Sequence, residues 1–167
     1  MQTLDRKAEQ QQFSYTREDW TSGYRSQPEE FAYWVEEVEG EIPTDLEGTV
    51  FRNGQGRTDV NGYRLKHPFD GDGMINSLSF KNGKAFYRNK FVRTEGYLKE
   101  QESGKPEYRG VFGTQKPGGW LANAFDLNFK NIANTHVVYW GDKLLALWEA
   151  AAPHRLAPYT LDTQDLD

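Results

Sequence analysis

Three histidines are the side chains in this sequence best suited to hold a transition metal. They are His67, His136 and His154, and no two of them are two or four residues apart. Such close spacings put two imidazoles on one face of a strand or helix, as locally built metal sites require. The sequence contains no cysteine, so disulfides and thiolate metal sites are excluded. The pattern favours a structural role for each histidine.

The run from His67 to Met74 places two carboxylates, Asp70 and Asp72, among glycines that permit positive φ. A calcium loop would continue with alternating oxygen ligands and end in a glutamate. Met74 instead stands where the third ligand would be, and no glutamate completes the pattern. We therefore predict a structural turn in which the two carboxylates accept hydrogen bonds from backbone N–H groups.

A third carboxylate, Glu149, ends the apolar run from Leu144 to Trp148. Burying a carboxylate without a partner costs several kcal/mol, so a buried glutamate would require a cation, a histidine or a metal beside it. The sequence leaves both placements open and favours the exposed one.

The elements that would position these residues are short strands joined by tight turns. Asn82-Gly83 and Gly141-Asp142 each lie between two apolar runs, and these residue types tolerate the positive φ of hairpin turns. Strands are expected at Thr49–Arg52, Ile75–Phe80, Ala85–Val92, Tyr108–Phe112, Val137–Trp140 and Lys143–Glu149. Residues 116–130 are expected to form a loop. Short strands at this spacing predict an all-β architecture.

The chain before residue 41 differs from the rest. Residues 1–12 are polar and predict a disordered leader, and residues 13–40 form an aromatic and acidic arm. Within this arm, residues 29–38 could form a short helix because apolar residues recur three and four positions apart. We interpret the arm as an extension lying on a core. Contact between its aromatic side chains and a membrane is the alternative.

The overall composition limits the partners. The net charge is −5, so no basic field is offered to nucleic acid, and no nucleic-acid partner is predicted. No apolar run approaches the ~20 residues of a membrane span, and the first residues contain no apolar signal core. We expect a cytoplasmic protein, with peripheral membrane association left open.

Several blocks of the sequence resemble, in the same order, the carotenoid cleavage oxygenases, iron enzymes that split polyenes with dioxygen. The blocks are Ile42-Pro43, Leu46-Glu47-Gly48, Phe51–Gly54, His67–Met74, Lys90–Thr94, Asn134-Thr135, Trp140–Asp142, Leu145–Glu149 and Pro153–Leu156. The family fold is a seven-bladed β-propeller whose ferrous iron is bound by four histidines. The resemblance implies that residues 41–167 form the N-terminal blades of an incomplete propeller, preceded by a helical or extended arm.

The resemblance also suggests roles for three residues. Glu149 matches a glutamate that hydrogen-bonds to an iron-ligand histidine, and Phe112 and Trp148 match positions that line the substrate tunnel. Strict alternation along a strand would place Trp148 and Glu149 on opposite faces, so both reach one site only at a strand end or a bulge. None of the three histidines matches an iron ligand. No catalytic residue and no metal ligand is assigned.

The sequence ends at Asp167, before the position where the resemblance would supply the first iron ligand. We therefore expect the N-terminal fragment of an Fe(II)-dependent carotenoid or apocarotenoid cleavage dioxygenase. The complete enzyme would use Fe(II), dioxygen and an apolar polyene substrate, whereas this chain alone would bind no iron and be inactive. A complementing chain could supply the missing blades. The alternatives are a non-catalytic remnant and a small β-rich protein that binds an apolar ligand.

Overall fold

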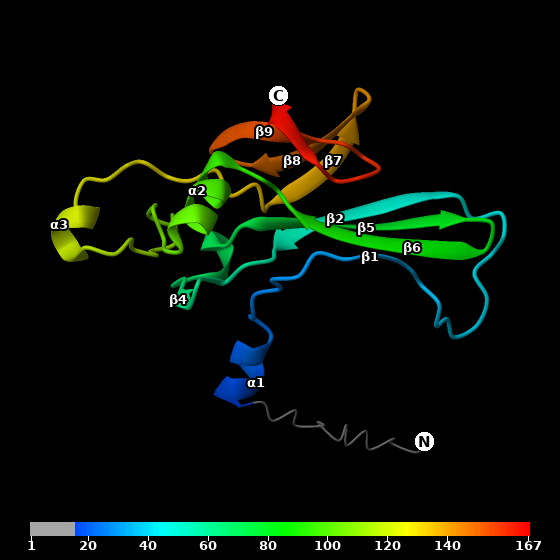
Figure 1. Cartoon of the computed structure of the whole chain (residues 1–167), viewed down its shortest axis with the longest axis horizontal. Helices are drawn as coiled ribbons and strands as arrows, with labels where there is room; N and C mark the ends of the chain where they lie inside the picture. Colours follow the sequence, from blue (N-terminus) through cyan, green and yellow to red (C-terminus); the bar gives the residue numbers. More distant parts are fainter. Residues whose placement is uncertain (1–15) are drawn as a thin grey trace, which may run out of the picture.

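Two antiparallel sheets of four strands each dominate the computed structural model, which describes residues 16–167 (Figure 1). The predicted leader, residues 1–12, lies outside the described residues. The first sheet has the strand order β1-β6-β5-β2 and the second has the order β10-β9-β8-β7, while β3 and β4 form a separate pair. The strands are β1 (Ala32–Trp34), β2 (Gly48–Gln55), β3 (Asp59–Val60), β4 (Tyr63–Arg64), β5 (Gly73–Lys81), β6 (Lys84–Phe91), β7 (His136–Trp140), β8 (Lys143–Trp148), β9 (Ala151–Leu156) and β10 (Thr163–Leu166). The described helices are α1 (Arg17–Ser22), α2 (Glu95–Ser103), α3 (Gly119–Asn123) and the 3-10 turn η1 (Pro68–Asp70).

Both predicted hairpins are confirmed. Asn82 and Gly83 join β5 to β6 with φ values of 51° and 70°, and Gly141 and Asp142 join β7 to β8 with φ values of 57° and 61°. Positive φ at both central residues is the type I′ geometry, whose twist matches that of the flanking strands. The two sheets are therefore each built around a hairpin that a dipeptide specifies locally.

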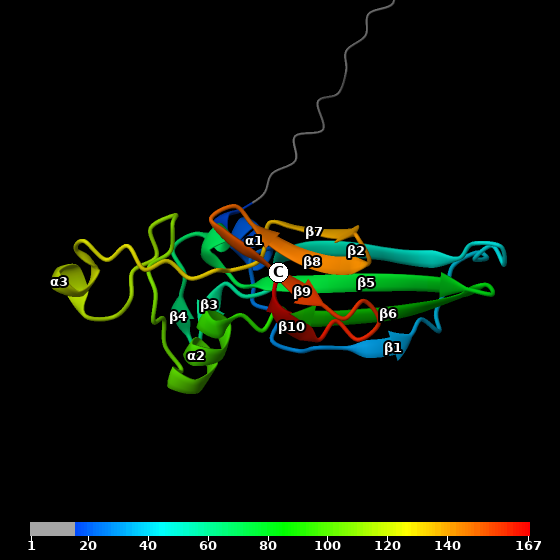
Figure 2. The same ribbon diagram turned by 90° about the horizontal axis from the view of Figure 1, so that it is seen from above.

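The second sheet lies over one face of the first, as the two perpendicular views agree (Figures 1 and 2). One apolar cluster lies between them. Its buried members are Ile75, Val92, Ala133, Val137, Leu144, Ala146, Leu156 and Leu161, with Phe51 packed against them. Burying these side chains stabilises the pairing of the sheets by about 25 cal/mol for each Å² of apolar surface removed from water. At one edge β2 lies beside β7, so the seam between the sheets runs along these two strands.

The helix predicted for residues 29–38 is wrong. This segment is extended, and its residues 32–34 form β1, which pairs antiparallel with β6. Main-chain bonds from Asn89 N to Phe31 O (3.1 Å) and from Val35 N to Ala85 O (2.9 Å) hold it there. The unpaired edge of β6 offers the segment backbone partners, and this outweighs the helical spacing of its apolar residues.

Three further features of the structure differ from what the sequence predicted. The strand predicted for Tyr108–Phe112 is absent, since this stretch contributes one isolated bridge, from Arg109 to Phe129. The strand predicted to end before Asn53 continues to Gln55. Helix α2 was not predicted. Thr94 Oγ1 caps its start by accepting from Tyr97 N (3.0 Å), and Gly104 ends it in the left-handed region.

The all-β expectation is confirmed, since strands make both layers and the helices are short. Across residues 16–167, no helix is both long enough and apolar enough to cross a membrane.

Candidate functional site

A cleft of about 390 Å³ opens where the ends of β2 and β8 meet the turn around η1. It is lined by Asn53, Gly54, Gln55, Phe69, Phe112, Asn134, Thr135, Trp148 and Glu149. Three aromatic rings and one carboxylate thus share one open space. All three residues that the resemblance singled out, Phe112, Trp148 and Glu149, are among the lining residues.

Trp148 and Glu149 both reach the cleft because β8 is irregular at its end. Ala146 pairs with His154, but Trp148 pairs with Ala151, so the register between β8 and β9 shifts in this interval. Such a bulge breaks the two-residue alternation of side chains. Glu149 follows as the first residue after β8. The structure therefore meets the condition under which two consecutive residues can serve one site.

Glu149 lies exposed at this strand end, which agrees with the placement that the sequence favoured. Its Oε2 accepts a hydrogen bond from Thr135 Oγ1 at 2.9 Å. One carboxylate oxygen is thereby oriented by a neutral donor, and the group keeps further acceptor capacity for a second donor. A carboxylate held in this way can orient an imidazole N–H.

Phe112 is held in the cleft by Asp70. Asp70 Oδ1 accepts from Phe112 N (2.9 Å), and Oδ2 accepts from Thr114 N (3.1 Å) and Thr114 Oγ1 (2.7 Å). The Phe112 ring stacks on His67 with ring centroids 4.9 Å apart and meets Phe69 edge-on at 5.7 Å. The prediction that Asp70 caps backbone N–H groups is confirmed. Its buried carboxylate fixes the loop that brings Phe112 to the cleft.

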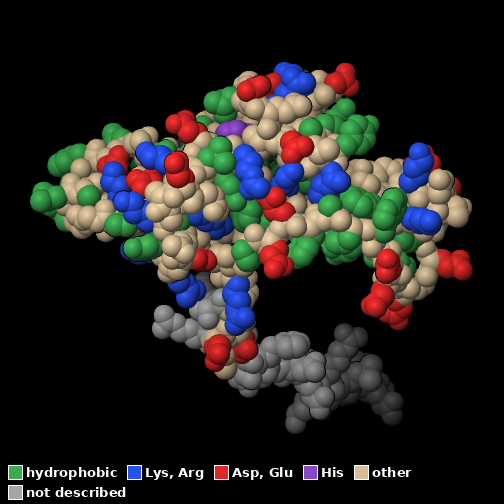
Figure 3. Space-filling view, viewed as in Figure 1, with side chains coloured by type: hydrophobic (Ala, Val, Ile, Leu, Met, Phe, Trp, Pro, Cys, Tyr) green, Lys and Arg blue, Asp and Glu red, His purple; other side chains and the backbone are tan. Residues whose placement is uncertain are grey.

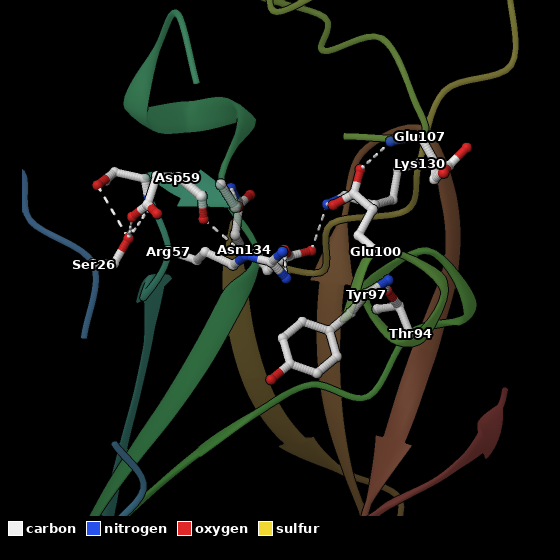
Figure 4. A network of polar contacts seen from close by, with 12 residues as sticks. Ser26, Arg57, Asp59, Thr94, Tyr97, Glu100, Glu107, Lys130 and Asn134 are labelled. Carbon is white, nitrogen blue, oxygen red and sulfur yellow. Dashed lines mark hydrogen bonds and ion pairs between the residues drawn. The ribbon is translucent and has the colours of Figure 1, made fainter. Parts of the chain in front are cut away.

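Asp72 behaves differently from the prediction, because it pairs with cations and not with backbone N–H groups. Its Oδ2 lies 3.3 Å from Arg57 Nη1 and its Oδ1 lies 2.9 Å from Lys130 Nζ. Lys130 also lies 2.7 Å from Glu100 Oε2, and Figure 4 shows these two side chains pointing toward one another from different segments. All four side chains are buried, so two cations and two anions balance in the interior.

The charges of this buried ion network determine the direction in which the pKa of Lys130 shifts. Burial alone would lower the pKa of Lys130, but the carboxylates of Asp72 and Glu100 outweigh it and hold that pKa above its usual value. Gly96 on α2 permits the approach, since a Cβ there would lie 2.2 Å from Lys130 Cγ. The lysine is therefore held as a cation between two elements that are distant in sequence.

The three histidines occupy separate places. His67 Nδ1 accepts from Phe69 N (3.1 Å) beside η1, and His136 is exposed at the start of β7. His154 is buried on β9, where burial lowers the pKa of its imidazole. Within residues 16–167, no three His, Cys, Asp or Glu side chains gather as a metal-binding group. The donors described in this chain do not fit an iron site on their own.

The segment around α3 projects from one end of the molecule (Figure 2), and its exposed apolar residues form a surface that we call the α3 tip. It comprises Trp120, Leu121, Phe125 and Leu127, of which Leu121 is 82% and Phe125 is 94% exposed. Hydrophobic side chains gather at this end of the space-filling view (left in Figure 3). The ion pair from Lys116 to Asp126 (2.5 Å) closes the loop that carries the tip.

Sequence reasoning assigned no role to Thr135, Asn53 or Asn134, which also line the cleft. All three belonged to blocks that carried the resemblance, Phe51–Gly54 and Asn134-Thr135, and this was the available signal. Their partners lie far away in the sequence, so spacing alone could not pair them.

Two sheets of propeller-blade type, joined at a seam that carries an aromatic cleft and an oriented carboxylate, define the class of protein. The family model described as retinal pigment epithelial membrane protein matches residues 24–167. The chain belongs to this carotenoid oxygenase family.

Relatives agree with this assignment. The chain is 57% identical to the apocarotenoid-15,15′-oxygenase of Synechocystis over 157 residues, which cover 93% of this chain and 32% of the relative. It is 30% identical to the beta,beta-carotene 15,15′-dioxygenase of Gallus gallus, covering 77% of this chain and 26% of that protein. The chain thus spans about a quarter to a third of the length of these two relatives.

Solved structures agree as well. The crystal structure of the cobalt-substituted Synechocystis enzyme superposes with a TM-score of 0.89 at 57% identity, covering 92% of this chain and 32% of that one. That enzyme is a seven-bladed propeller, so the present chain is part of such a propeller. The partial-propeller expectation is confirmed.

Other solved structures of the Synechocystis enzyme carry a replaced glutamate, a replaced tryptophan or a replaced threonine. In that enzyme the tryptophan directly precedes the glutamate, and the threonine lies 14 residues before the glutamate, by their numbers. Trp148, Glu149 and Thr135 have the same spacing here, since Glu149 lies 14 positions after Thr135. These are three residues that the cleft brings together.

Proposed function

We propose that this chain is the N-terminal part of an Fe(II)-dependent dioxygenase that cleaves a double bond of a carotenoid or apocarotenoid. The observation that carries the proposal is the cleft in which Glu149 meets Phe112 and Trp148. A polyene is long, apolar and flat, and aromatic side chains bury such a surface while excluding water. The names of the relatives, which act on apocarotenoid and beta-carotene, support the same substrate class.

In this proposal Glu149 is a positioning residue. Its carboxylate, already oriented by Thr135, accepts a hydrogen bond from an imidazole that binds the metal. Such an acceptor fixes the tautomer and aim of the imidazole. Bound iron would supply the chemistry of dioxygen. The described residues do not hold iron by themselves, so they are assigned only binding and orienting roles.

Phe112 and Trp148 are proposed to line the path of the polyene. Phe112 is 51% exposed, and its ring is backed by His67 and Phe69, so a flat ligand can stack on it without moving the loop. Trp148 is half-buried at the end of β8. Rigid aromatic walls bind an apolar ligand with little loss of side-chain entropy.

Two further partners follow from the same proposal. Completion of the propeller requires blades from further sequence or from a complementing chain, because this chain covers 32% of its Synechocystis relative. The exposed α3 tip supports peripheral contact with a membrane that holds the apolar substrate. This chain alone is proposed to bind no iron and to lack activity.

A chimera tests the proposal. Residues 1–167 of this chain replace the matching part of the Synechocystis apocarotenoid oxygenase, and the product is assayed with an apocarotenal. We expect bound iron and cleavage, because this chain would supply Glu149 and the aromatic walls. A folded chimera that binds iron but leaves the polyene intact would contradict the proposal.

The isolated chain decides the alternatives. If the chain is a small β-rich binding protein, added apocarotenal should quench its tryptophan fluorescence. The quenching should reach saturation and should not require iron. A non-catalytic remnant would yield an inactive chimera and show no such binding. We expect the isolated chain to show neither iron binding nor cleavage, while the chimera shows both.

A further inference from the structure

The segment of residues 133–136, which leads into β7, is bound from one side by Asn53 of β2. Asn53 Nδ2 donates to Ala133 O at 2.8 Å and to His136 O at 2.9 Å. Both acceptors are carbonyl oxygens, so the orientation of the amide is fixed: the flipped group would set Oδ1 against two oxygens. One side chain thus spans the segment and ties it across the seam between the sheets.

Asn134 binds the same segment to the other neighbour, the turn around η1. Its Nδ2 donates to Phe69 O at 3.0 Å and to Gly71 O at 2.7 Å. Each amide therefore uses both of its N–H donors on backbone carbonyls. The two side chains add no charge beside the cleft, in contrast to a lysine or arginine used for the same purpose.

Thr135 lies between these anchors. Its backbone N donates to Leu147 O at 3.1 Å, and its hydroxyl donates to Glu149 Oε2 at 2.9 Å. Ala133 has a φ of 45°, a conformation that costs energy for a residue with a Cβ and persists only where the surroundings impose it. The hydrogen bond from Asn53 to Ala133 O is one such constraint.

We propose that Asn53 and Asn134 are positioning residues that fix Thr135 and, through its hydroxyl, orient Glu149 in the cleft. The link from Glu149 to turnover rests on the proposed function, whereas the positioning of Thr135 rests on the hydrogen bonds alone. An amide pair is suited to this task because it binds the backbone on both sides of Thr135 and adds no charge beside Glu149.

The test compares Asn53→Ala and Asn134→Ala in the chimeric enzyme. Hydrogen–deuterium exchange of peptides covering residues 131–140 reports the segment, and kcat and KM report the site. We expect exchange in both variants to rise about tenfold, because each loses two hydrogen bonds that restrain the segment. We also expect kcat to fall about tenfold with KM within about twofold, because orientation and not binding is lost.

Asn89→Ala is the matched control. Asn89 also makes two hydrogen bonds to backbone groups, from Nδ2 to Glu29 O (3.1 Å) and from Phe31 N to its Oδ1 (2.5 Å), but it does not line the cleft. Its loss should leave exchange at 131–140 and kcat unchanged. If Asn53→Ala fails to fold, Asn53→Ser retains one donor, and its exchange should lie above that of the parent protein.

The outcomes separate the two levels of the inference. If residues 131–140 exchange no faster in the asparagine variants than in the parent protein, the positioning of Thr135 is overturned, whether or not the chimera is active. Faster exchange with unchanged kcat would overturn the link to Glu149 and leave the proposed function intact. An inactive parent chimera would count against the proposed function alone, since exchange still reports the segment.

Discussion

Lys130 and Glu100 form a buried ion pair, with Nζ and Oε2 2.7 Å apart. The other oxygen of Glu100 accepts from Glu107 N at 3.0 Å. A single carboxylate on α2 therefore holds both ends of the excursion from residue 107 to residue 130. This excursion carries Phe112 and the α3 tip, so Glu100 anchors the base of the loop from which both project.

Replacing Glu100 by Gln should loosen the base of this excursion. Removing one partner of a buried ion pair destabilises by roughly 3–5 kcal/mol. We expect chymotrypsin to cut the loop between residues 107 and 130 at least about tenfold faster, because cleavage follows the population of the opened state. Glu102→Gln, on an exposed position of the same helix, is the control and should leave the rate unchanged. Equal cleavage rates in both variants would show that Glu100 does not hold the base.

Replacing Gly110 by Ala should disturb Phe112. A Cβ at Gly110 would lie 2.2 Å from Asp70 Cγ, and Asp70 accepts from Phe112 N. We expect the midpoint of thermal unfolding of the chimera to fall, with a loss of about 1–3 kcal/mol typical of overpacking. Gly54→Ala is the matched change, because a Cβ there meets nothing within 4 Å. If the midpoint falls equally in both variants, the close approach of Gly110 to Asp70 is not the cause of the loss.

His154 should make stability depend on pH. Burial lowers the pKa of this imidazole below its usual value of 6.5, so the folded chain keeps it neutral where the unfolded chain takes up a proton. The free energy of unfolding should therefore fall as the pH drops below about 6.5, by at most about 1.4 kcal/mol per pH unit from this group. Urea titrations of the parent and of His154→Gln at about pH 7.5 and about pH 5 measure it.

The His154→Gln variant should lose part of that pH dependence. His136→Gln, at an exposed position on β7, should retain all of it. If the parent and His154→Gln change equally between the two pH values, His154 is not the source.

The α3 tip should carry the proposed membrane contact. Burying one Leu or Phe side chain is worth about 1.5–3 kcal/mol, so Leu121→Ser with Phe125→Ser should weaken binding to phosphatidylcholine vesicles by at least about tenfold. Sedimentation with the vesicles measures the bound fraction. Trp140→Ser with Tyr159→Ser removes two similarly exposed rings, one at the end of β7 and one in the loop between β9 and β10, and should change little. Equal losses in both pairs would point to general hydrophobicity and not to the tip.

Local signals explain what the sequence could predict of the fold. The dipeptides Asn82-Gly83 and Gly141-Asp142 determine their turns through their own φ preferences, so both hairpins were predicted correctly. The segment of residues 29–38 was predicted incorrectly because its structure depends on the free edge of β6. Helix α2 was missed because its buried residues, Gly96, Tyr97 and Glu100, do not form an apolar stripe.

The candidate site could also be predicted only in part. The resemblance located Phe112, Trp148 and Glu149, and the structure places all three on one cleft. Asp72 was predicted to cap a turn, because nothing near it in sequence announces Arg57 or Lys130 as partners. These partners are 15 and 58 residues away and meet it only when the sheets and α2 assemble. Ion pairs of this kind are determined by tertiary packing.

The pairing of β1 with β6 has a consequence for synthesis. A ribosome releases the residues of β1 first, but their hydrogen-bonding partners, Ala85 to Asn89, follow some fifty residues later. At about 5–20 residues per second, this early strand waits a few seconds or longer with exposed aromatic rings and no sheet to join. During synthesis, β1 is therefore the first strand of this sheet to be made and the last to be added to it. Until β6 supplies Tyr87 and Phe86, the rings of Tyr33 and Trp34 lack the partners on which they pack in the folded sheet.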